Sequence, residues 1–329
     1  MTFKAFVGRK SDDGYACAFE ELEDDALPSG ERVTIDVSHS SLNYKDGLAV
    51  TGRGRIIRRF PMVPGIDLAG TVTHSDSDDL KPGDLVLGTG QGLGETEWGG
   101  FTQRQRVLRD AVVRVPDGMT LEQSMQLGTA GLTAMMAVLA LERNGVVPDD
   151  REVVVTGAGG GVGSIAVMLL AARGYKVAAA TGRPELEPYL RTLGAVSIVT
   201  REELTSAKGP LQSERWAGGI DTVGGPILSN LYAQTAYGGA VACCGMAASH
   251  ELNATVWPMI LRNVSLLGVS TLKPSQAARN EAWERLAATI DFETLGTVAR
   301  TEPLSAIVAL SEEIMEGRVQ GRVVLDTGR

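Results

Sequence analysis

The pattern of hydrophobic and polar positions changes once along the chain, near residue 121. Before this point, short apolar runs such as 33–37 and 85–88 are separated by turn signals such as KPGD at 81–84. This pattern predicts a β-rich segment. Residues 121–141 then show helical periodicity, with Thr120 at the N-cap position and Glu122 in the first turn, where its charge suits the helix dipole.

Buried strands and helices alternate in the region that follows. Strands are expected at 152–156, 176–180, 196–200, 219–223, 240–244 and 264–269, and helices at 162–173 and 185–193. Such alternation predicts an α/β fold, with a mostly parallel, doubly wound sheet of the Rossmann type covered by helices on both faces.

The C-terminal part carries two more helical patterns, at 275–290 and 304–315, and a last strand at 322–326. This strand has no place in a six-stranded nucleotide domain, so we expect it to return to the N-terminal β-rich part. A chain of 329 residues is long enough for two domains. We therefore predict a discontinuous β-rich domain, 1–122 and 273–329, and a nucleotide-binding domain, 123–272.

Charge and cysteine usage exclude several classes of function. The chain has 31 Lys and Arg against 40 Asp and Glu, a net charge of −9, which argues against general binding of nucleic acid. Its three cysteines, two of them adjacent, form no disulfide framework and indicate a reducing compartment. No signal peptide is apparent, and the longest apolar helix candidate, 165–172, is too short for a bilayer. We expect a cytoplasmic protein with no membrane partner.

Forty glycines are more than this length ordinarily carries, and the densest group lies in VVVTGAGGGVGS at 153–164. An apolar strand meets a helix there, as in the G-x-G-x-x-G turn of dinucleotide-binding domains, with Ala158 in place of the first glycine. The N-terminus of that helix offers N–H groups to a pyrophosphate. The alternative is an ordinary glycine-rich turn, which the flanking strand and helix disfavour. The residues expected to bind the dinucleotide are Gly159, Gly160, Gly161 and Val162.

The end of the next strand indicates which dinucleotide binds. NAD sites usually place a carboxylate there, whereas this chain has Thr181, Gly182 and Arg183 and no acid until Glu185. A hydroxyl and a guanidinium suit a 2′-phosphate, so the sequence favours NADPH, with Arg201 as a second positive group. The alternative is that Arg183 is a solvated residue at a helix start.

Several segments together resemble the medium-chain dehydrogenase/reductase superfamily over essentially the whole chain. They are SSLNYKD at 40–46, PGIDLAG at 64–70, KPGDLV at 81–86, GTAGLTA at 128–134, IDTVGG at 220–225 and LRNVSLLGVS at 261–270. With TGR at 181–183 and TGRGRIIRRFP at 51–61, the chain is most similar to the acrylyl-CoA reductases within the zinc-free, quinone oxidoreductase-like branch. The resemblance implies a GroES-like fold for the β-rich domain and a homodimer.

The resemblance also bears on metal binding. Zinc-dependent members have a ligand Cys where this chain has Asn43, and a His-Glu pair where it has Ile66 and Asp67. None of the three histidines falls at a ligand position, so we expect no metal. Without a Lewis acid, conjugate reduction of an enoyl thioester is the chemistry that remains.

Three residues are candidates for that chemistry. Tyr44 is expected to contact the nicotinamide and to be a possible proton donor, Asn43 to be a polar donor, and Asp67 to be a buried orienting group. Each has an alternative: Tyr44 as a packing residue, Asn43 in a turn, and Asp67 as a cap of local N–H groups. Water is an alternative proton source, because an ordinary tyrosine with a pKa near 10 is a slow acid at neutral pH.

Further positions complete the expected site. Arg53 and Arg55 are candidates for the phosphates of a CoA ester, with a solvated charge cluster as the alternative. By resemblance alone, Met246, Ile260 and Ser270 are expected near the nicotinamide and its ribose. The sequence thus indicates an enzyme that uses NADPH to reduce acrylyl-CoA to propanoyl-CoA. The alternatives are an NADPH quinone reductase and a non-catalytic NADPH-binding protein.

Overall fold

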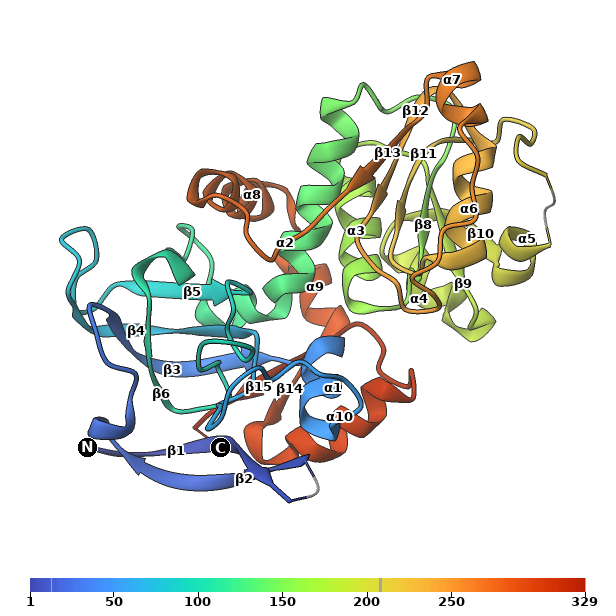
Figure 1. The fold of residues 1–329 in the computed structure, drawn as a ribbon. Coiled ribbons are helices and arrows are strands. Elements are labelled where there is room, and N and C mark those ends of the chain that lie inside the picture. The colour runs from blue at the N-terminus through green and yellow to red at the C-terminus, as the bar shows by residue number, and fades with distance from the viewer. Residues whose placement is uncertain (13, 207–208, 329) are drawn as a thin grey trace. The chain divides into compact units, whose positions relative to one another are not determined.

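The structure is a computed structural model that describes residues 1–12, 14–206 and 209–328. The chain divides into two compact units (Figure 1). Unit 1 comprises Met1–Leu132, Thr271–Ala287 and Leu295–Arg329, and unit 2 comprises Thr133–Ser270 and Ala288–Thr294. The first boundary therefore falls after residue 132, where the sequence suggested 122, and a short segment at 288–294 joins unit 2 through its contacts.

Unit 2 contains a doubly wound parallel sheet. Among the described residues its strands follow the spatial order β10-β9-β8-β11-β12-β13, and every pairing is parallel. This order is that of a Rossmann sheet, so the predicted fold class is confirmed. The strands are β8 (Val153–Thr156), β9 (Val177–Thr181), β10 (Ala195–Thr200), β11 (Trp216–Asp221), β12 (Thr235–Cys243) and β13 (Ser265–Gly268).

Helices connect these strands. The strand β8 is buried along its whole length, and α3 is buried from Gly163 to Leu170, because both lie in the core of the unit. The helices of unit 2 are α3 (Gly161–Ala172), α4 (Glu187–Thr192), α5 (Arg201–Thr205), α6 (Gly225–Gln234) and α7 (Trp257–Arg262), with a 3-10 turn, η3 (Pro184–Leu186), before α4.

Unit 1 is built on a mainly antiparallel sheet. In the described part of the chain its order is β14-β15-β3-β4-β5-β7, with β6 also paired to β3, and β1 and β2 form a separate hairpin. The last strand, β15, returns to the N-terminal β-rich part, as predicted, where it pairs antiparallel with β3. The strands are β1 (Thr2–Ser11), β2 (Gly14–Glu23), β3 (Val33–Ser41), β4 (Asp67–Ser75), β5 (Leu85–Thr89), β6 (Arg104–Val107), β7 (Val112–Arg114), β14 (Ala299–Pro303) and β15 (Arg322–Asp326).

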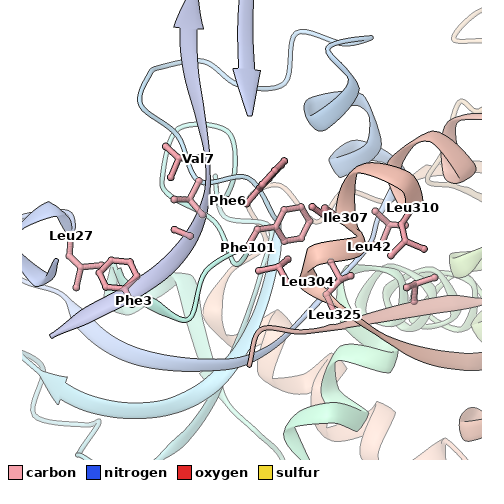
Figure 2. Close-up of a cluster of buried hydrophobic side chains, with 13 residues drawn as sticks. Phe3, Phe6, Val7, Leu27, Leu42, Phe101, Leu304, Ile307, Leu310 and Leu325 are labelled. Atoms are coloured by element: carbon pink, nitrogen blue, oxygen red, sulfur yellow. The ribbon is translucent and has the colours of Figure 1, made fainter. Parts of the chain in front are cut away.

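A hydrophobic cluster joins the hairpin of unit 1 to its C-terminal helix. Figure 2 shows side chains from β1, from the loop at Phe101 and from the segment around Ile307 meeting in this cluster. The helices and 3-10 turns of this part are η1 (Asp24–Ala26), α1 (Tyr44–Thr51), η2 (Arg109–Ala111), η4 (Leu304–Ala306) and α10 (Ile307–Met315), and α8 (Gln276–Thr289) and α9 (Phe292–Val298) connect segments of the two units.

The longest helix is α2 (Leu121–Arg143), which begins at the predicted cap: Thr120 Oγ1 accepts from the N–H of Gln123 at 3.1 Å. With 23 residues it corrects the expectation that the longest apolar helix is 165–172. By length and composition α2 could cross a membrane, but 78% of its apolar window is buried within the protein, as in a core helix. Gly128 interrupts it with non-helical dihedral angles.

Candidate functional site

A glycine turn joins β8 to α3 in unit 2. A Cβ added to Gly163 would lie 2.3 Å from the carbonyl oxygen of Gly157, so glycine is what lets the helix pack this closely on the turn. Gly160 is the N-cap of α3, and Gly161 and Val162 are in its first turn. First-turn N–H groups have no acceptor within a helix. The turn therefore presents donors and the positive end of the helix dipole, a combination that fits a pyrophosphate.

Two arginine side chains lie at the ends of the neighbouring strands. Nη2 of Arg183 donates to the carbonyl oxygen of Gly159 at 3.4 Å, and the N–H of Arg183 donates to Thr181 Oγ1 at 3.1 Å. A Cβ added to Gly182 would lie 2.7 Å from Nη2 of Arg201. The structure thus brings these residues together beside the glycine turn, where two guanidinium groups suit a phosphate monoester.

A buried aspartate organises the ends of β8 and β11. Asp221 is fully buried, and its carboxylate accepts from Thr156 Oγ1 and from the N–H of Gly224, both at 2.7 Å. Thr222 completes the network by donating through its N–H to Thr156 Oγ1 at 3.1 Å and through Oγ1 to the Thr156 carbonyl at 2.9 Å. Burial raises the pKa of Asp221. Sequence reasoning assigned no role to this residue, although an acid that ends a buried strand is a detectable signal.

The remaining cofactor positions separate into two groups. Met246 follows β12 and lies beside the loop after Asp221, since a Cβ added to Gly224 would be 3.3 Å from the Met246 Cα. Ser270 is exposed and follows β13. Ile260 differs from the sequence interpretation within one chain: it lies on α7, which precedes β13. In a parallel sheet that position is at the opposite end from the glycine turn of the same chain.

A buried polar cluster occupies unit 1, with Asp67 at its centre. Asp67 is fully buried and accepts from Ser41 Oγ at 2.5 Å and from Asn43 Nδ2 at 2.8 Å. Thr129 donates to it twice, through its N–H at 2.9 Å and through Oγ1 at 2.5 Å. Arg322 Nη2 lies 4.0 Å from the carboxylate. Asp67 is therefore a saturated acceptor, consistent with an orienting role.

Arg322 supplies the positive charge of this cluster. Its side chain is 3% exposed and donates to the carbonyl oxygens of Gln126 at 3.0 Å and Leu42 at 3.1 Å, and to Ser41 Oγ at 2.8 Å. Burial lowers the pKa of Arg322, and the negative charge of Asp67 opposes that shift. A buried guanidinium needs such partners, because an unpaired one is strongly destabilising.

Asn43 is held by the same cluster, which corrects its predicted role as a donor to substrate. Its Nδ2 faces Asp67 at 2.8 Å and Asp46 at 3.1 Å, and its Oδ1 accepts from Arg322 at 3.3 Å. An amide nitrogen carries two hydrogens, and both are engaged by carboxylates here. Asn43 is instead the N-cap of α1 and positions the two acids.

Asp46 is the second acid of the cluster. It is 1% exposed and accepts from the N–H groups of Ile66 and Asn43, each at 2.9 Å. Burial, followed by the charge of Asp67, raises the pKa of Asp46 to about 7. A protonated Asp46 leaves Asp67 and Arg322 as one negative and one positive charge, which balances the buried cluster.

The other predicted residues of unit 1 are accessible. Tyr44 is the first residue of α1 and is 48% exposed, which disfavours the alternative that it is a packing residue. Arg53 Nη2 pairs with Glu312 at 2.6 Å, both side chains being about half exposed, and Arg55 is exposed. Such exposed pairs are weak, so a phosphate could compete with Glu312 for Arg53.

Comparison with known proteins places the chain in a family. Residues 29–117 match the alcohol dehydrogenase GroES-like domain, and residues 161–288 match the zinc-binding dehydrogenase family. The chain is 46% identical to the acrylyl-CoA reductase of Ruegeria pomeroyi over 98% of its own length and 99% of that protein. The chain belongs to the medium-chain dehydrogenase/reductase superfamily.

Two further members of the superfamily resemble this chain closely. A putative quinone oxidoreductase of Bacillus subtilis is 38% identical, with 98% of each chain covered. The crystal structure of an oxidoreductase from Salmonella enterica in complex with NADP superposes with a TM-score of 0.95 at 46% identity, covering 98% of this chain and 99% of that one. The full-length matches confirm the family resemblance drawn from the sequence motifs.

The residues of this superfamily member do not fit a catalytic zinc ion. At the positions of the zinc ligands, Ile66 offers no ligand atom and Asn43 is engaged by carboxylates. Asp67 is engaged by four donor groups and has the Arg322 guanidinium nearby. Among the residues that the structure describes, no group of three or more His, Cys, Asp or Glu could hold a metal ion.

Sequence reasoning missed most of the partners of Asp67. Arg322 opens the last strand and Thr129 stands within GTAGLTA, and both are far from Asp67 in sequence. Asp46 was quoted within SSLNYKD but assigned no role. Each of these three residues is a charged or polar residue inside an apolar segment, which is a signal of a buried polar role. Only the strand pairing in the structure shows that they lie next to Asp67.

Proposed function

We propose that this protein reduces the conjugated C=C bond of acrylyl-CoA with NADPH to form propanoyl-CoA, without zinc. The observation that carries the proposal is the near-full-length match to an acrylyl-CoA reductase. It is supported by the two arginines beside the glycine turn and by a polar cluster that does not fit a metal.

The reaction joins a hydride to the β carbon of the acrylyl group while the π electrons of the C=C bond move onto the thioester as an enolate. A proton then bonds to the α carbon and the carbonyl re-forms. Bound NADPH supplies the hydride and is oxidised to NADP⁺. The protein holds the thioester, stabilises the charge on its oxygen and controls access of the proton.

Specific residues take these roles. Gly159 to Val162 hold the pyrophosphate, and Arg183 and Arg201 hold the 2′-phosphate of NADPH. Tyr44, accessible at the start of α1, is the candidate proton donor, with water as the alternative. Asp67 orients Asn43 and Thr129 and does not itself contact substrate. Arg53 and Arg55 bind the CoA phosphates, with Glu312 displaced from Arg53.

The deciding experiment follows NADPH oxidation by the purified protein with acrylyl-CoA, crotonyl-CoA and 1,4-benzoquinone. Highest kcat/KM for acrylyl-CoA is the expected result. Equal or faster turnover of the quinone overturns the proposal, and NADPH binding without turnover of any acceptor indicates a non-catalytic protein. Metal analysis accompanies the assay, because stoichiometric zinc in the active protein would exclude a zinc-free mechanism.

Quinone reduction is the second candidate function, and the 38% identical Bacillus subtilis relative favours it. The arginines separate the two functions, because a quinone has no phosphates. Arg53→Ala combined with Arg55→Ala should raise the KM for acrylyl-CoA and leave the KM for benzoquinone unchanged.

A homodimer is part of the proposal. In the described part of the sheet of unit 2, β13 is an edge strand, and α7 presents exposed apolar side chains next to it in sequence. Burying both in a second copy would remove an unpaired strand edge and an apolar surface from water. Light scattering should show a dimer that Ile260→Glu dissociates and that Val308→Glu, at an exposed apolar position of α10, does not; the two side chains are 71% and 53% exposed. A monomeric native protein would contradict the proposal.

A further inference from the structure

Two neighbouring strands of unit 2 end side by side next to the glycine turn. In the parallel pairing of β9 with β10, Thr181 is opposite Thr200, and each is the last residue of its strand. The residue that follows is Gly182 in one strand and Arg201 in the other. Both are exposed, so a bound molecule can reach them. The register of the sheet therefore places a glycine beside an accessible arginine at this edge.

The guanidinium of Arg201 lies flat against Gly182. A Cβ added to Gly182 would be 2.7 Å from Nη2, 2.8 Å from Cζ and 2.9 Å from Nε of Arg201. Because these three atoms of a planar group are almost equally distant, the added atom would lie over the face of the guanidinium and not at its edge. Non-bonded heavy atoms are normally about 3.5–4.0 Å apart. A side chain at position 182 would therefore displace the guanidinium.

A left-handed backbone does not explain the glycine at position 182. The φ angle of Gly182 is outside the left-handed region, whereas Gly157 in the glycine turn has φ = 60°. The three heavy atoms nearest to the added Cβ, apart from those of the neighbouring residues in the chain, all belong to Arg201. What glycine provides at this position is therefore space for the Arg201 guanidinium.

The charge of Arg201 serves no contact within the described part of the chain. Arg201 is the first residue of α5, where a positive charge opposes the helix dipole. Glu203, two residues on, accepts from the N–H of Thr200 at 3.1 Å and pairs with Arg215 at 3.1 Å. Among the residues that the structure describes, none accepts a hydrogen bond from the Arg201 guanidinium or forms an ion pair with it. Its N–H groups, which lie in the guanidinium plane, are therefore available to a bound anion.

We propose that Gly182 determines the preference of this protein for NADPH over NADH, because it seats the guanidinium of Arg201. This inference rests on the proposed function, in which Arg183 and Arg201 bind the 2′-phosphate, and adds a positioning residue to it. Arg183 extends toward the glycine turn, where its Nη2 donates to the Gly159 carbonyl at 3.4 Å. With Arg201 flat on Gly182, a phosphate at this edge meets the donors of two cations. NADH has a hydroxyl in place of that phosphate and gains much less from them.

The first test is Gly182→Ala. The added methyl group should move the Arg201 guanidinium off its seat, so the dissociation constant for NADP⁺ should rise about tenfold. The constant for NAD⁺ and the melting temperature should not change, because the displaced group is the end of a flexible side chain. The matched control is Gly296→Ala, where the added methyl group meets no atom within 4 Å and both constants should stay native. Native affinity for NADP⁺ in Gly182→Ala, or an equal loss for both cofactors, would overturn the proposal.

A double-mutant cycle determines whether Gly182 acts through Arg201. In a protein that carries Arg201→Ala, no guanidinium remains to be displaced, so adding Gly182→Ala should cause no further loss of affinity for NADP⁺. Additive losses would mean that alanine at position 182 hinders the cofactor directly, which would overturn the positioning role. The control combines Gly182→Ala with Arg191→Ala. Arg191 is paired with Glu187 on α4, so this double variant should lose as much affinity as Gly182→Ala alone.

A charged side chain at position 182 should have a larger effect. Gly182→Asp introduces a carboxylate at the strand end where NAD sites usually have one, and this carboxylate repels a 2′-phosphate. The ratio of NADP⁺ affinity to NAD⁺ affinity should therefore fall further than in Gly182→Ala. Gly182→Asn, which has a similar size and no charge, is the matched control. Equal ratios in the Asp and Asn variants would overturn the proposal, because no phosphate would then be bound at this edge.

Binding of nucleotide fragments separates this inference from the proposed function. Calorimetry with 2′,5′-ADP and 5′-AMP requires neither an acyl-CoA nor turnover. The native protein should bind 2′,5′-ADP more tightly than 5′-AMP, and Gly182→Ala should reduce that difference about tenfold. An active acrylyl-CoA reductase whose Gly182→Ala variant keeps the native difference overturns the inference alone. A protein that shows the expected loss but does not reduce acrylyl-CoA overturns the proposed reaction alone.

Discussion

Thr129 binds both oxygens of Asp67: its N–H donates to Oδ2 at 2.9 Å and its hydroxyl to Oδ1 at 2.5 Å. Thr129 directly follows the interruption of α2 at Gly128, so the carboxylate serves as the cap of the second half of that helix. An acid near a helix N-terminus is favourable by hydrogen bonding and by the helix dipole. The pair thus anchors the longest helix of the chain to β4.

Asp67→Asn should destabilise the protein strongly. The change removes the negative charge opposite Arg322, which is 3% exposed, and breaking a buried pair of this kind costs about 3–5 kcal/mol. Urea unfolding measures the loss. The control is Asp84→Asn, whose surface pair with Arg114, with side chains 24% and 55% exposed, should contribute less. Equal effects of the two substitutions would show that the buried cluster is not stabilised by its charges.

Gly128→Ala should also be destabilising, by about 2–4 kcal/mol. Gly128 has φ = 52° and ψ = −153°, and a Cβ there would lie 2.5 Å from Asp67 Oδ2 and 2.7 Å from Ser41 Oγ. Gly296→Ala, on α9 with no atom near the added Cβ, should instead stabilise by about 0.5–1 kcal/mol. Thermal unfolding should show a lower melting temperature for Gly128→Ala and a higher one for Gly296→Ala than for the native protein.

Asp46 should make stability depend on pH. Its pKa is raised to about 7, so the folded protein binds a proton more tightly than the unfolded chain does. The free energy of unfolding therefore falls as pH rises from about 4 to about 7, by at most about 1.4 kcal/mol per pH unit from this group.

The variant Asp46→Asn carries a neutral side chain at every pH and lacks this contribution. Relative to the native protein it should become steadily more stable as pH rises through that window. Urea unfolding at pH 5 and pH 8 measures the difference, and parallel pH profiles of the two proteins would contradict the assignment.

Arg183→Ala and Arg201→Ala should lower selectivity for NADPH. Each guanidinium beside the glycine turn should contribute about 1.5–3 kcal/mol to the binding free energy of a 2′-phosphate. The KM for NADPH should therefore rise about tenfold to a hundredfold in each variant. The KM for NADH should not change. Arg191→Ala is the control, since Arg191 is paired with Glu187 on the surface of α4. Equal increases for both cofactors would exclude the 2′-phosphate role.

Asp221→Asn should weaken binding of NADP⁺ without any contact to it. The carboxylate holds the loop after β11 through Thr156 and Gly224, and an amide at this position turns a donor toward the N–H of Gly224. Calorimetry should show a loss of about tenfold in affinity. Thr235→Val, which removes a buried hydrogen bond to Leu231 at the start of β12, should lower the melting temperature and leave the affinity unchanged.

The local pattern of hydrophobic and turn-forming residues was sufficient to predict much of the fold. The six strands of unit 2, the capped start of α2 and the return of the last strand to the N-terminal β-rich part were all predicted, because burial periodicity and turn residues act over short stretches. The β1–β2 hairpin was not predicted as such. Most of β2 is exposed or half-buried, so it lacks the clear alternation of a strand with one face in the core.

The sequence by itself determined the glycine turn and the two arginines beside it, since the turn is a continuous segment and both arginines follow strand ends whose place is set by the parallel sheet. Only the tertiary structure decided the role of Asn43, the place of Ile260 and the cluster of Asp46, Asp67 and Arg322. Arg322 and Ser41, which are hydrogen-bonded in that cluster, are 281 positions apart. The contacts between these buried charges depend on strand pairing between distant parts of the chain. A local sequence pattern therefore does not predict them.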